Sequence, residues 1–170
     1  MKNKKAVLTR VICIVLVLSV SALLCFIFIH HSKSQNTVQD TDTAMNLFAT
    51  YYDSTGYAVG DVAATSLFDK YAASNVDVTS NDANGSALIS MYAMESTKDA
   101  KAVVSRLKNT SNEAYTIATE KLGSKEITLM MGDGITYAIC QVASNVYIAF
   151  DFKDGFEKTY ADFKDFLGTV

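Results

Sequence analysis

An unbroken apolar run near the start of the chain is the strongest pattern in the sequence. The run extends from Val11 to Ile29 without a charged residue, and the only charges before it are those of Lys2, Lys4, Lys5 and Arg10. These nineteen residues, as a helix, would be about 28 Å long, which matches the hydrocarbon thickness of a bilayer. The pattern predicts a transmembrane signal anchor over residues 11–29, with the basic residues 1–10 in the cytoplasm.

Signal-peptidase cleavage and lipidation are two alternatives to an uncleaved anchor, and both fit this run less well. Ser19 and Ser21 form a poor signal-peptidase site, and cleavage after Ser21 would leave a long apolar N-terminus in water. Lipidation at Cys25 requires a small residue directly before the cysteine, where Leu24 stands. We therefore expect a single-pass protein of the cell membrane whose C-terminal domain lies outside the cytoplasm.

Helical spacing of apolar positions begins again after a polar juxtamembrane linker over residues 30–41. The extracytoplasmic domain is expected over residues 42–170. Its first apolar stripe predicts a helix over Thr43–Ser54, and a second stripe predicts a short helix over Ala63–Ala73. A run rich in Asn, Asp, Ser and Gly at Thr79–Ser86 predicts a loop.

The middle of the domain contains one strand and one helix with a clear start. Ala87–Glu95 is apolar at nearly every position, which is typical of a central strand. Ser96, followed three residues later by Asp99, forms a variant of the capping box and predicts the first turn of a helix. For residues 113–122 the pattern fits either a helix or an extended segment.

Alternation with a period of two dominates the last third of the sequence. It predicts three strands joined by two tight turns and followed by a C-terminal helix. The strands begin near Ile127, Ile135 and Val146, the turns are Gly132–Gly134 and Ser144–Asn145, and the helix begins near Asp154. The complete expectation is an α+β fold in which an N-terminal transmembrane helix precedes a two-layer domain. In that domain, helices cover one face of an antiparallel sheet of about four strands.

Charge and cysteine content restrict the setting of this domain. Four of the 15 basic residues precede the apolar run and all 18 acidic residues follow it, so the remainder of the chain has a formal charge of −7. This acidic balance argues against nucleic acid as a partner. Cys13 and Cys25 lie in the run, which leaves Cys140 without an intrachain disulfide partner in the domain. A bacterial envelope that makes little use of disulfides fits this pattern best.

The sequence contains few groups for catalysis. His30 and His31 are the only histidines, and they are interpreted as a polar cap at the end of the span, so a Ser-His-Asp triad is excluded from the domain. The segment from Ser80 has part of a calcium-loop pattern, but Met91 occupies the position of the bidentate glutamate. Cys140 is expected to be buried. We therefore expect no catalytic residue, no metal ligand and no cofactor.

Tyrosine is the one residue type that suggests a binding surface. Tyr51, Tyr52 and Tyr57 gather around the end of the first predicted helix, and tyrosine favours half-buried positions with a solvated hydroxyl. The same cluster would also suit a helix end that covers a sheet edge. The first functional hypothesis is a non-catalytic interaction or accessory module of the envelope, with an envelope protein as its partner. The alternatives are a small-ligand sensor or carrier and, third, an envelope enzyme that uses carboxylates.

Overall fold

The computed structural model describes residues 42–67, 70–80, 86–110 and 114–170 of the 170-residue chain. The described part begins with a helix over residues 42–54, which confirms the helix predicted from its apolar stripe. Met45, Phe48 and Tyr52 form the buried side of this helix. Gly56 follows with a φ of 88°, a backbone conformation that glycine adopts without strain and that ends the helix.

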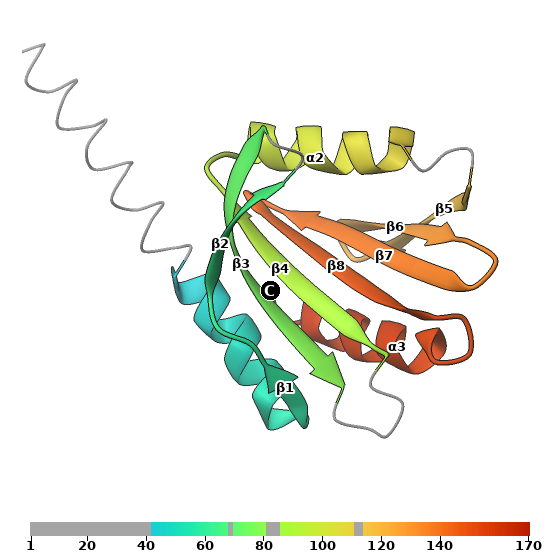
Figure 1. Ribbon diagram of the computed structural model, residues 1–170, viewed down its shortest axis with the longest axis horizontal. Helices are drawn as coiled ribbons and strands as arrows, with labels where there is room; N and C mark the ends of the chain where they lie inside the picture. The colour runs from blue at the N-terminus through green and yellow to red at the C-terminus, as the bar shows by residue number, and fades with distance from the viewer. Residues whose placement is uncertain (1–41, 68–69, 81–85, 111–113) are drawn as a thin grey trace, which may run out of the picture. The chain divides into compact units, whose positions relative to one another are not determined.

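Eight strands of the described residues form a single antiparallel sheet (Figure 1). Along the sheet the order is β1-β3-β4-β8-β7-β6-β5, and β2 pairs with β3 on the same side as β1. The long strand β3 therefore has two short neighbours at one sheet edge, while β5 forms the other edge. The strands are β1 Tyr57–Val59, β2 Ala63–Leu67, β3 Tyr71–Ser80, β4 Leu88–Met94, β5 Thr116–Leu122, β6 Lys125–Met131, β7 Ile135–Val142 and β8 Asn145–Phe152.

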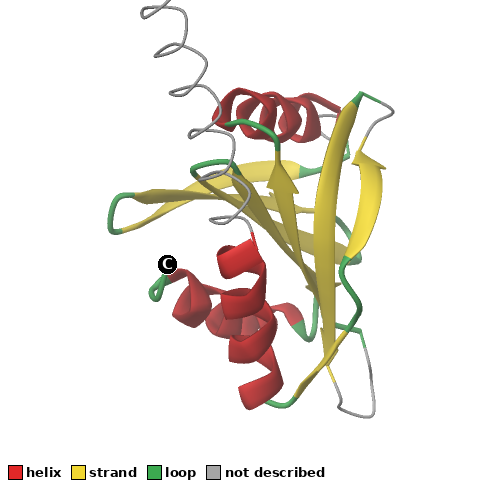
Figure 2. Ribbon diagram, turned by 90° about the vertical axis from the view of Figure 1, so that its left-hand side faces the viewer, coloured by secondary structure: helices red, strands yellow, loops and turns green. Residues whose placement is uncertain are grey.

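Helices cover both faces of this sheet (Figure 2). The helix 42–54 and α3 (Phe156–Leu167) pack on one face, in a core that includes Val76, Met91 and Tyr147. Helix α2 (Thr97–Thr110) packs on the other face, in a smaller core. The strand residues of the two cores alternate along the chain, since Ile139 belongs to the α2 core while Cys140 belongs to the α3 core.

The two-layer fold predicted from the sequence is therefore wrong in two respects. The sheet has eight strands where about four were expected, and α2 lies on the face opposite α3, so the described domain has three layers. The α+β class and the three-strand meander of β6, β7 and β8 are confirmed. The sheet is larger because the region between the helix 42–54 and β4 adds three strands, and β5 adds one more.

The short helix predicted over Ala63–Ala73 is also incorrect. This region forms β2 and the start of β3, which pair with each other from Leu67↔Tyr71 to Ala63↔Asn75. Residues 113–122, which were ambiguous in sequence, contribute the edge strand β5. In both regions, hydrogen bonding to a neighbouring strand overrides a weak local helical pattern.

The transmembrane part of the predicted fold has no counterpart among the residues that the structure describes. Of the helices in the described ranges, each is too short or too polar to cross a bilayer. The predicted span 11–29, its basic flank 1–10 and the linker 30–41 lie outside the described residues.

Helix α2 begins as the capping-box pattern predicts. The Ser96 hydroxyl accepts a hydrogen bond from the backbone N–H of Asp99 at 3.1 Å and donates one to the Asp99 carboxylate at 2.6 Å. This exchange satisfies one of the backbone donors that a helix leaves unpaired in its first turn. The cap fixes where the chain leaves β4 and starts to cross the sheet.

An ionic contact ties the edge strand β5 to α3. Tyr160 donates a hydrogen bond to Glu120 at 2.7 Å, and the Lys164 ammonium lies 3.4 Å from the same carboxylate. The hydrogen bond from Tyr160, and then the charge of Lys164, lower the pKa of Glu120 below its ordinary value of 4.5. Since this pKa is lower in the folded state, the contact stabilises the fold above the unfolded-state pKa and is lost as pH falls through the folded-state pKa.

Replacing Tyr160 with Phe should therefore raise the pKa of Glu120 and weaken the acid dependence of stability. The pKa can be followed by NMR titration of the Glu120 side-chain carboxyl carbon below pH 6. The variant Lys158→Gln is a suitable control, because it removes one charge from α3 and leaves the Tyr160 hydroxyl in place. An unchanged Glu120 titration in Tyr160→Phe would contradict this account of the contact.

Candidate functional site

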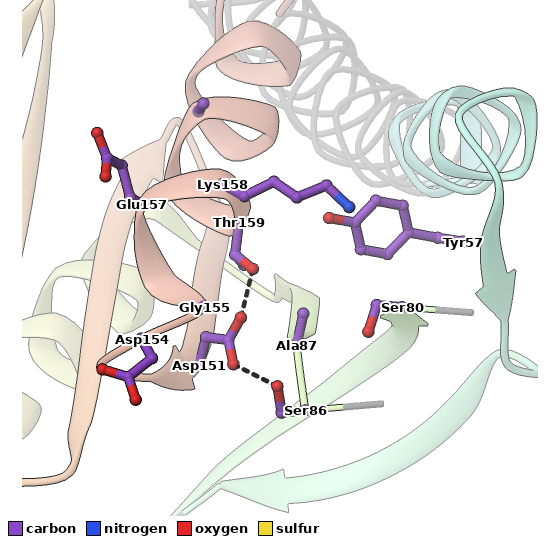
Figure 3. Close-up of a pocket in the computed structure, with 11 residues that line it drawn as sticks. Tyr57, Ser80, Ser86, Ala87, Asp151, Asp154, Gly155, Glu157, Lys158 and Thr159 are labelled. Atoms are coloured by element: carbon purple, nitrogen blue, oxygen red, sulfur yellow. Dashed lines mark hydrogen bonds between the residues drawn. The ribbon is translucent and has the colours of Figure 1, made fainter. Parts of the chain in front are cut away.

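Asp151 is the most deeply buried carboxylate of the described residues, and its hydrogen bonds show how it is used. It lies at the end of β8, is 3% exposed, and accepts hydrogen bonds from the Ser86 hydroxyl at 2.7 Å and the Thr159 hydroxyl at 2.6 Å (Figure 3). The backbone N–H of Phe152 donates a third, at 2.7 Å. A Cβ atom on Gly155 would lie 2.7 Å from this carboxylate. Asp151 thus joins β8, α3 and the residues before β4.

A hollow of about 470 Å³ lies beside Asp151, but its polar groups do not converge on one point. Figure 3 shows Tyr57 and Lys158 directed toward each other across one end, while Asp154 and Glu157 point away from them. The Tyr57 hydroxyl donates to Asp162 at 2.8 Å. Asp151 is engaged with Ser86 and Thr159, and Tyr57 is engaged with Asp162, so these groups of the hollow hold the fold together.

The three tyrosines singled out in the sequence lie around one aromatic cluster. Tyr52 is fully buried and Tyr57 is 7% exposed, with their ring centroids 5.2 Å apart, while Tyr51 is half-buried. Burial raises the pKa of Tyr52, and its hydroxyl has no hydrogen-bond partner among the described residues. Tyr52 therefore serves the core, and Tyr57 lines the Asp151 hollow. A binding surface formed by the three together remains a prediction.

The other residues considered for chemistry lie in structural positions. Cys140 is fully buried, as expected, and burial raises the pKa of its thiol to about 11. Met91 is fully buried in β4, while residues 81–85 of the calcium-like segment lie outside the described residues. Gly132–Gly134 forms the β6–β7 turn, closed by a 2.9 Å hydrogen bond from Gly132 to Ile135. Within the described ranges, no three His, Cys, Asp or Glu side chains gather into a possible metal site.

Four other aromatic residues form a row of successive ring contacts on the sheet face that α2 covers. The ring centroids of Tyr115 and Tyr137 are 5.7 Å apart, those of Tyr137 and Phe150 are 5.3 Å apart, and those of Phe150 and Phe152 are 6.2 Å apart. We call these four residues the aromatic row. Strand register creates it, since Tyr137 on β7 is directly opposite Phe150 on β8.

The aromatic row begins beside the α2 core, against which Tyr115 and Tyr137 pack, and ends at the exposed Phe152. Tyr115, Tyr137 and Phe150 are half-buried, and Phe152 is 54% exposed. Leu88 on β4 is opposite Phe150, and Ile135 on β7 is opposite Phe152, so aliphatic side chains extend the same surface. An accessible apolar surface of this kind is typical of a contact site, because its exposure to water is unfavourable.

A small apolar pocket opens between α2 and the aromatic row. Its volume is about 200 Å³, and its lining is mainly hydrocarbon and aromatic ring. This volume is below the range of about 300–1,000 Å³ that is common for small-molecule sites. The pocket is better suited to one anchoring side chain of a partner. It is lined by Leu107, Tyr115, Met130, Tyr137, Ile139 and Ile148.

Polar groups with unused acceptors occupy the same face on the β3 side. Asn75 is 9% exposed and donates to the Asp77 carboxylate at 3.3 Å. The Asn75 Oδ1 and Asp77 Oδ1 atoms are buried without a hydrogen-bond partner among the described residues. Asp77 is opposite Ser90, and Ser90 is opposite Ile148 of the apolar pocket. Because both oxygens are buried, they lie beneath the surface of this face and not on it.

Sequence reasoning identified none of these positions as a site. Tyr137 and Phe150 lie in two of the predicted alternating strands, and their contact depends on the register of the β7–β8 hairpin. Comparison with known proteins adds little. No protein-family model matches the chain, and no curated protein matches it. The chain is similar to a crystal structure of a GTP-binding regulator from Thermotoga maritima, at 14% identity and a TM-score of 0.48, covering 72% of this chain and 82% of that one. A likeness at this level carries no argument about function.

Proposed function

We propose that the domain is a non-catalytic interaction module that binds an apolar segment of a protein partner along the aromatic row. The observation that carries this proposal is the continuous contact of four rings on an incompletely covered sheet face, ending in the 54% exposed side chain of Phe152. Aromatic side chains give large contact areas with few rotatable bonds, which makes them frequent centres of protein interfaces.

The chemistry of this face indicates what the partner segment must supply. An aliphatic or aromatic side chain would fill the 200 Å³ pocket beside Tyr137, and its neighbours would cover Phe150 and Phe152. A small-ligand carrier is a weaker explanation of this face because the pocket is too small to enclose such a ligand. That the partner is an envelope protein stays a prediction from the sequence.

Site-specific photo-crosslinking in the native cells tests this proposal. A photoreactive amino acid at position 152 of the full chain should yield one defined protein adduct. The matched control is position 47, because Leu47 is 46% exposed and lies in the helix 42–54, which packs on the opposite face of the sheet. Equal adducts from both positions would contradict a specific surface.

The affinity of the captured partner provides the second measurement. For the purified pair, Phe152→Ser should raise the Kd at least tenfold, since an aromatic side chain on which an interface depends contributes about 2 kcal/mol and 1.4 kcal/mol corresponds to a factor of ten. Leu47→Ser should leave the Kd within a factor of two. An unchanged Kd for Phe152→Ser would rule out the aromatic row as the binding surface.

A further inference from the structure

Helix α2 covers only one end of its sheet face in the described part of the chain. Its core includes Val146 at the start of β8 and Ile139 in the second half of β7. Phe150 and Phe152 of the aromatic row lie at the other end of β8. The opposite face carries two helices, 42–54 and α3, over one core (Figure 2). Among the described residues, the α2 face therefore has one helix where the other face has two.

The spacing of side chains along β8 leaves room for one more helix. Helix α2 contacts β4, β8 and β7, which are neighbours in the sheet, so its axis crosses these strands. Residues rise about 3.3 Å each along a strand, so Ile148, Phe150 and Phe152 lie about 7, 13 and 20 Å from Val146. Packed helices lie about 8–10 Å apart, axis to axis. A second helix beside α2 would therefore run between Ile148 and Phe150, with its far side near Phe152.

The position of the aromatic row argues against an extended partner segment. β7 and β8 are each paired on both sides, and strand addition requires the unpaired backbone of a sheet edge. On the face itself, the floor beside the pocket is formed by Leu88, Ile148 and Phe150, whose side chains have no hydrogen-bonding groups. An extended segment there would remove backbone N–H and C=O groups from water without giving them partners, whereas a helix pairs those groups internally.

We propose that the partner segment is an amphipathic α-helix that lies beside α2, across β7, β8 and β4. Neighbouring strands are about 4.8 Å apart and one helical turn rises about 5.4 Å, so apolar side chains on successive turns would lie over these three strands in order. The side chain over β7 would fill the apolar pocket of about 200 Å³, since an apolar cavity of about 150 Å³ already holds a benzene ring. This inference rests on the proposed function and specifies the class of partner.

Charge on α2 indicates what the side of the partner helix that faces it must carry. Four basic residues and one acidic residue lie in α2, and one of the four, Lys108, is paired with Glu126. Arg106 is exposed, directly precedes Leu107 of the apolar pocket, and lies about 140° around the helix axis from Lys101, which lines a hollow on the other flank. Carboxylates on the partner helix would be attracted to the Arg106 flank.

A second copy of this chain is a poor match for this occupant. The helix 42–54, α2 and α3 each bury their apolar side in the cores of their own domain. The described part of another copy therefore offers no amphipathic helix with a free apolar stripe. This leaves a helix of a different protein, apolar on one side and acidic along one flank, as the partner.

A synthetic peptide that copies the segment crosslinked to position 152 tests this inference on the full-length chain. Its helical circular dichroism signal should increase on binding. A proline in the middle of the peptide, on its solvent side, should raise the Kd measured by calorimetry at least thirtyfold, because proline removes a backbone donor and breaks a helix. Proline in the first turn is the matched control and should change the Kd less than threefold.

Two charge reversals in α2 test on which side of it the peptide lies. Arg106→Glu should raise the Kd of the peptide at least fivefold at low ionic strength, and added salt should reduce the difference. Lys101→Glu makes the same charge change on the other flank and should alter the Kd less than twofold. Equal effects of the two variants would overturn the placement of the helix beside the pocket.

The outcomes separate this inference from the proposed function. A peptide that binds only when Phe152 is present, gains no helix and tolerates the central proline would overturn the helical partner and leave the proposed function standing. A crosslink from position 152 to a second copy of the chain would likewise overturn the helical partner. If position 152 forms no specific adduct, both proposals are wrong.

Discussion

Replacing Phe166 with Ala is expected to lower the free energy of unfolding by about 3–5 kcal/mol, the largest effect of any single change considered for this protein. Phe166 is fully buried in α3. Its ring centroid lies 5.3 Å from that of Phe48 and 5.4 Å from that of Tyr147. Truncation would leave a cavity where the helix 42–54, α3 and the sheet meet, and the rings around it cannot collapse together to fill it.

Denaturant unfolding followed by circular dichroism measures this loss as a lower transition midpoint at an unchanged slope. Tyr52→Phe is the matched control in the same cluster, because it keeps the ring and removes a buried hydroxyl that has no partner among the described residues. That control should unfold at the same midpoint or slightly higher. A cost below about 1 kcal/mol for Phe166→Ala would mean that α3 is not held by this cluster.

Replacing Asp151 with Ala should cost about 2–4 kcal/mol of stability, because it removes three hydrogen bonds at once and leaves the buried Thr159 hydroxyl without its acceptor. The Ser86 and Thr159 hydroxyls both donate to this carboxylate, so the change loosens α3 and the residues before β4 together. Hydrogen exchange should become faster in the first turn of α3 before the central strands are affected.

Two companion variants show whether the carboxylate itself is responsible. Asp151→Asn keeps the shape and one acceptor oxygen, and the Thr159 hydroxyl can accept from the new amide, so its cost should be less than half that of Asp151→Ala. Gly155→Ala should be destabilising for a steric reason, since the added Cβ would lie 2.7 Å from an Asp151 oxygen that is fixed by hydrogen bonding. Equal stability of Asp151→Ala and the unmodified chain would refute the role assigned to this residue.

The local sequence pattern was sufficient to predict those helices and strands whose apolar residues recur with a regular helical or strand period. The helix 42–54, α2, α3 and the β6–β8 meander all follow from apolar spacing, capping residues and short turns. Strand β3 was missed because its face toward α2 carries Asn75 and Asp77 between small residues, which obscures the alternation. Its buried valines, Val76 and Val78, become informative only once β4 lies beside it.

The candidate sites depend on features that no single segment contains. The aromatic row requires the register of β7 against β8 and the arrival of Tyr115 from the residues before β5. Which part of a sheet face stays open is determined by where α2 crosses it, and that position is set by tertiary packing.

The division of one sheet edge between two short strands also bears on how the protein avoids self-association. β1 covers the end of β3 near Ser80 and β2 covers its beginning, with Gly60 bonded to Asp77 between them at 2.8 Å. An incoming chain therefore meets two offset segments of three and five residues in place of one ten-residue template. Strand addition of the kind that seeds fibrils needs a long, regular row of unpaired amides. At this edge, the fold itself limits polymerisation.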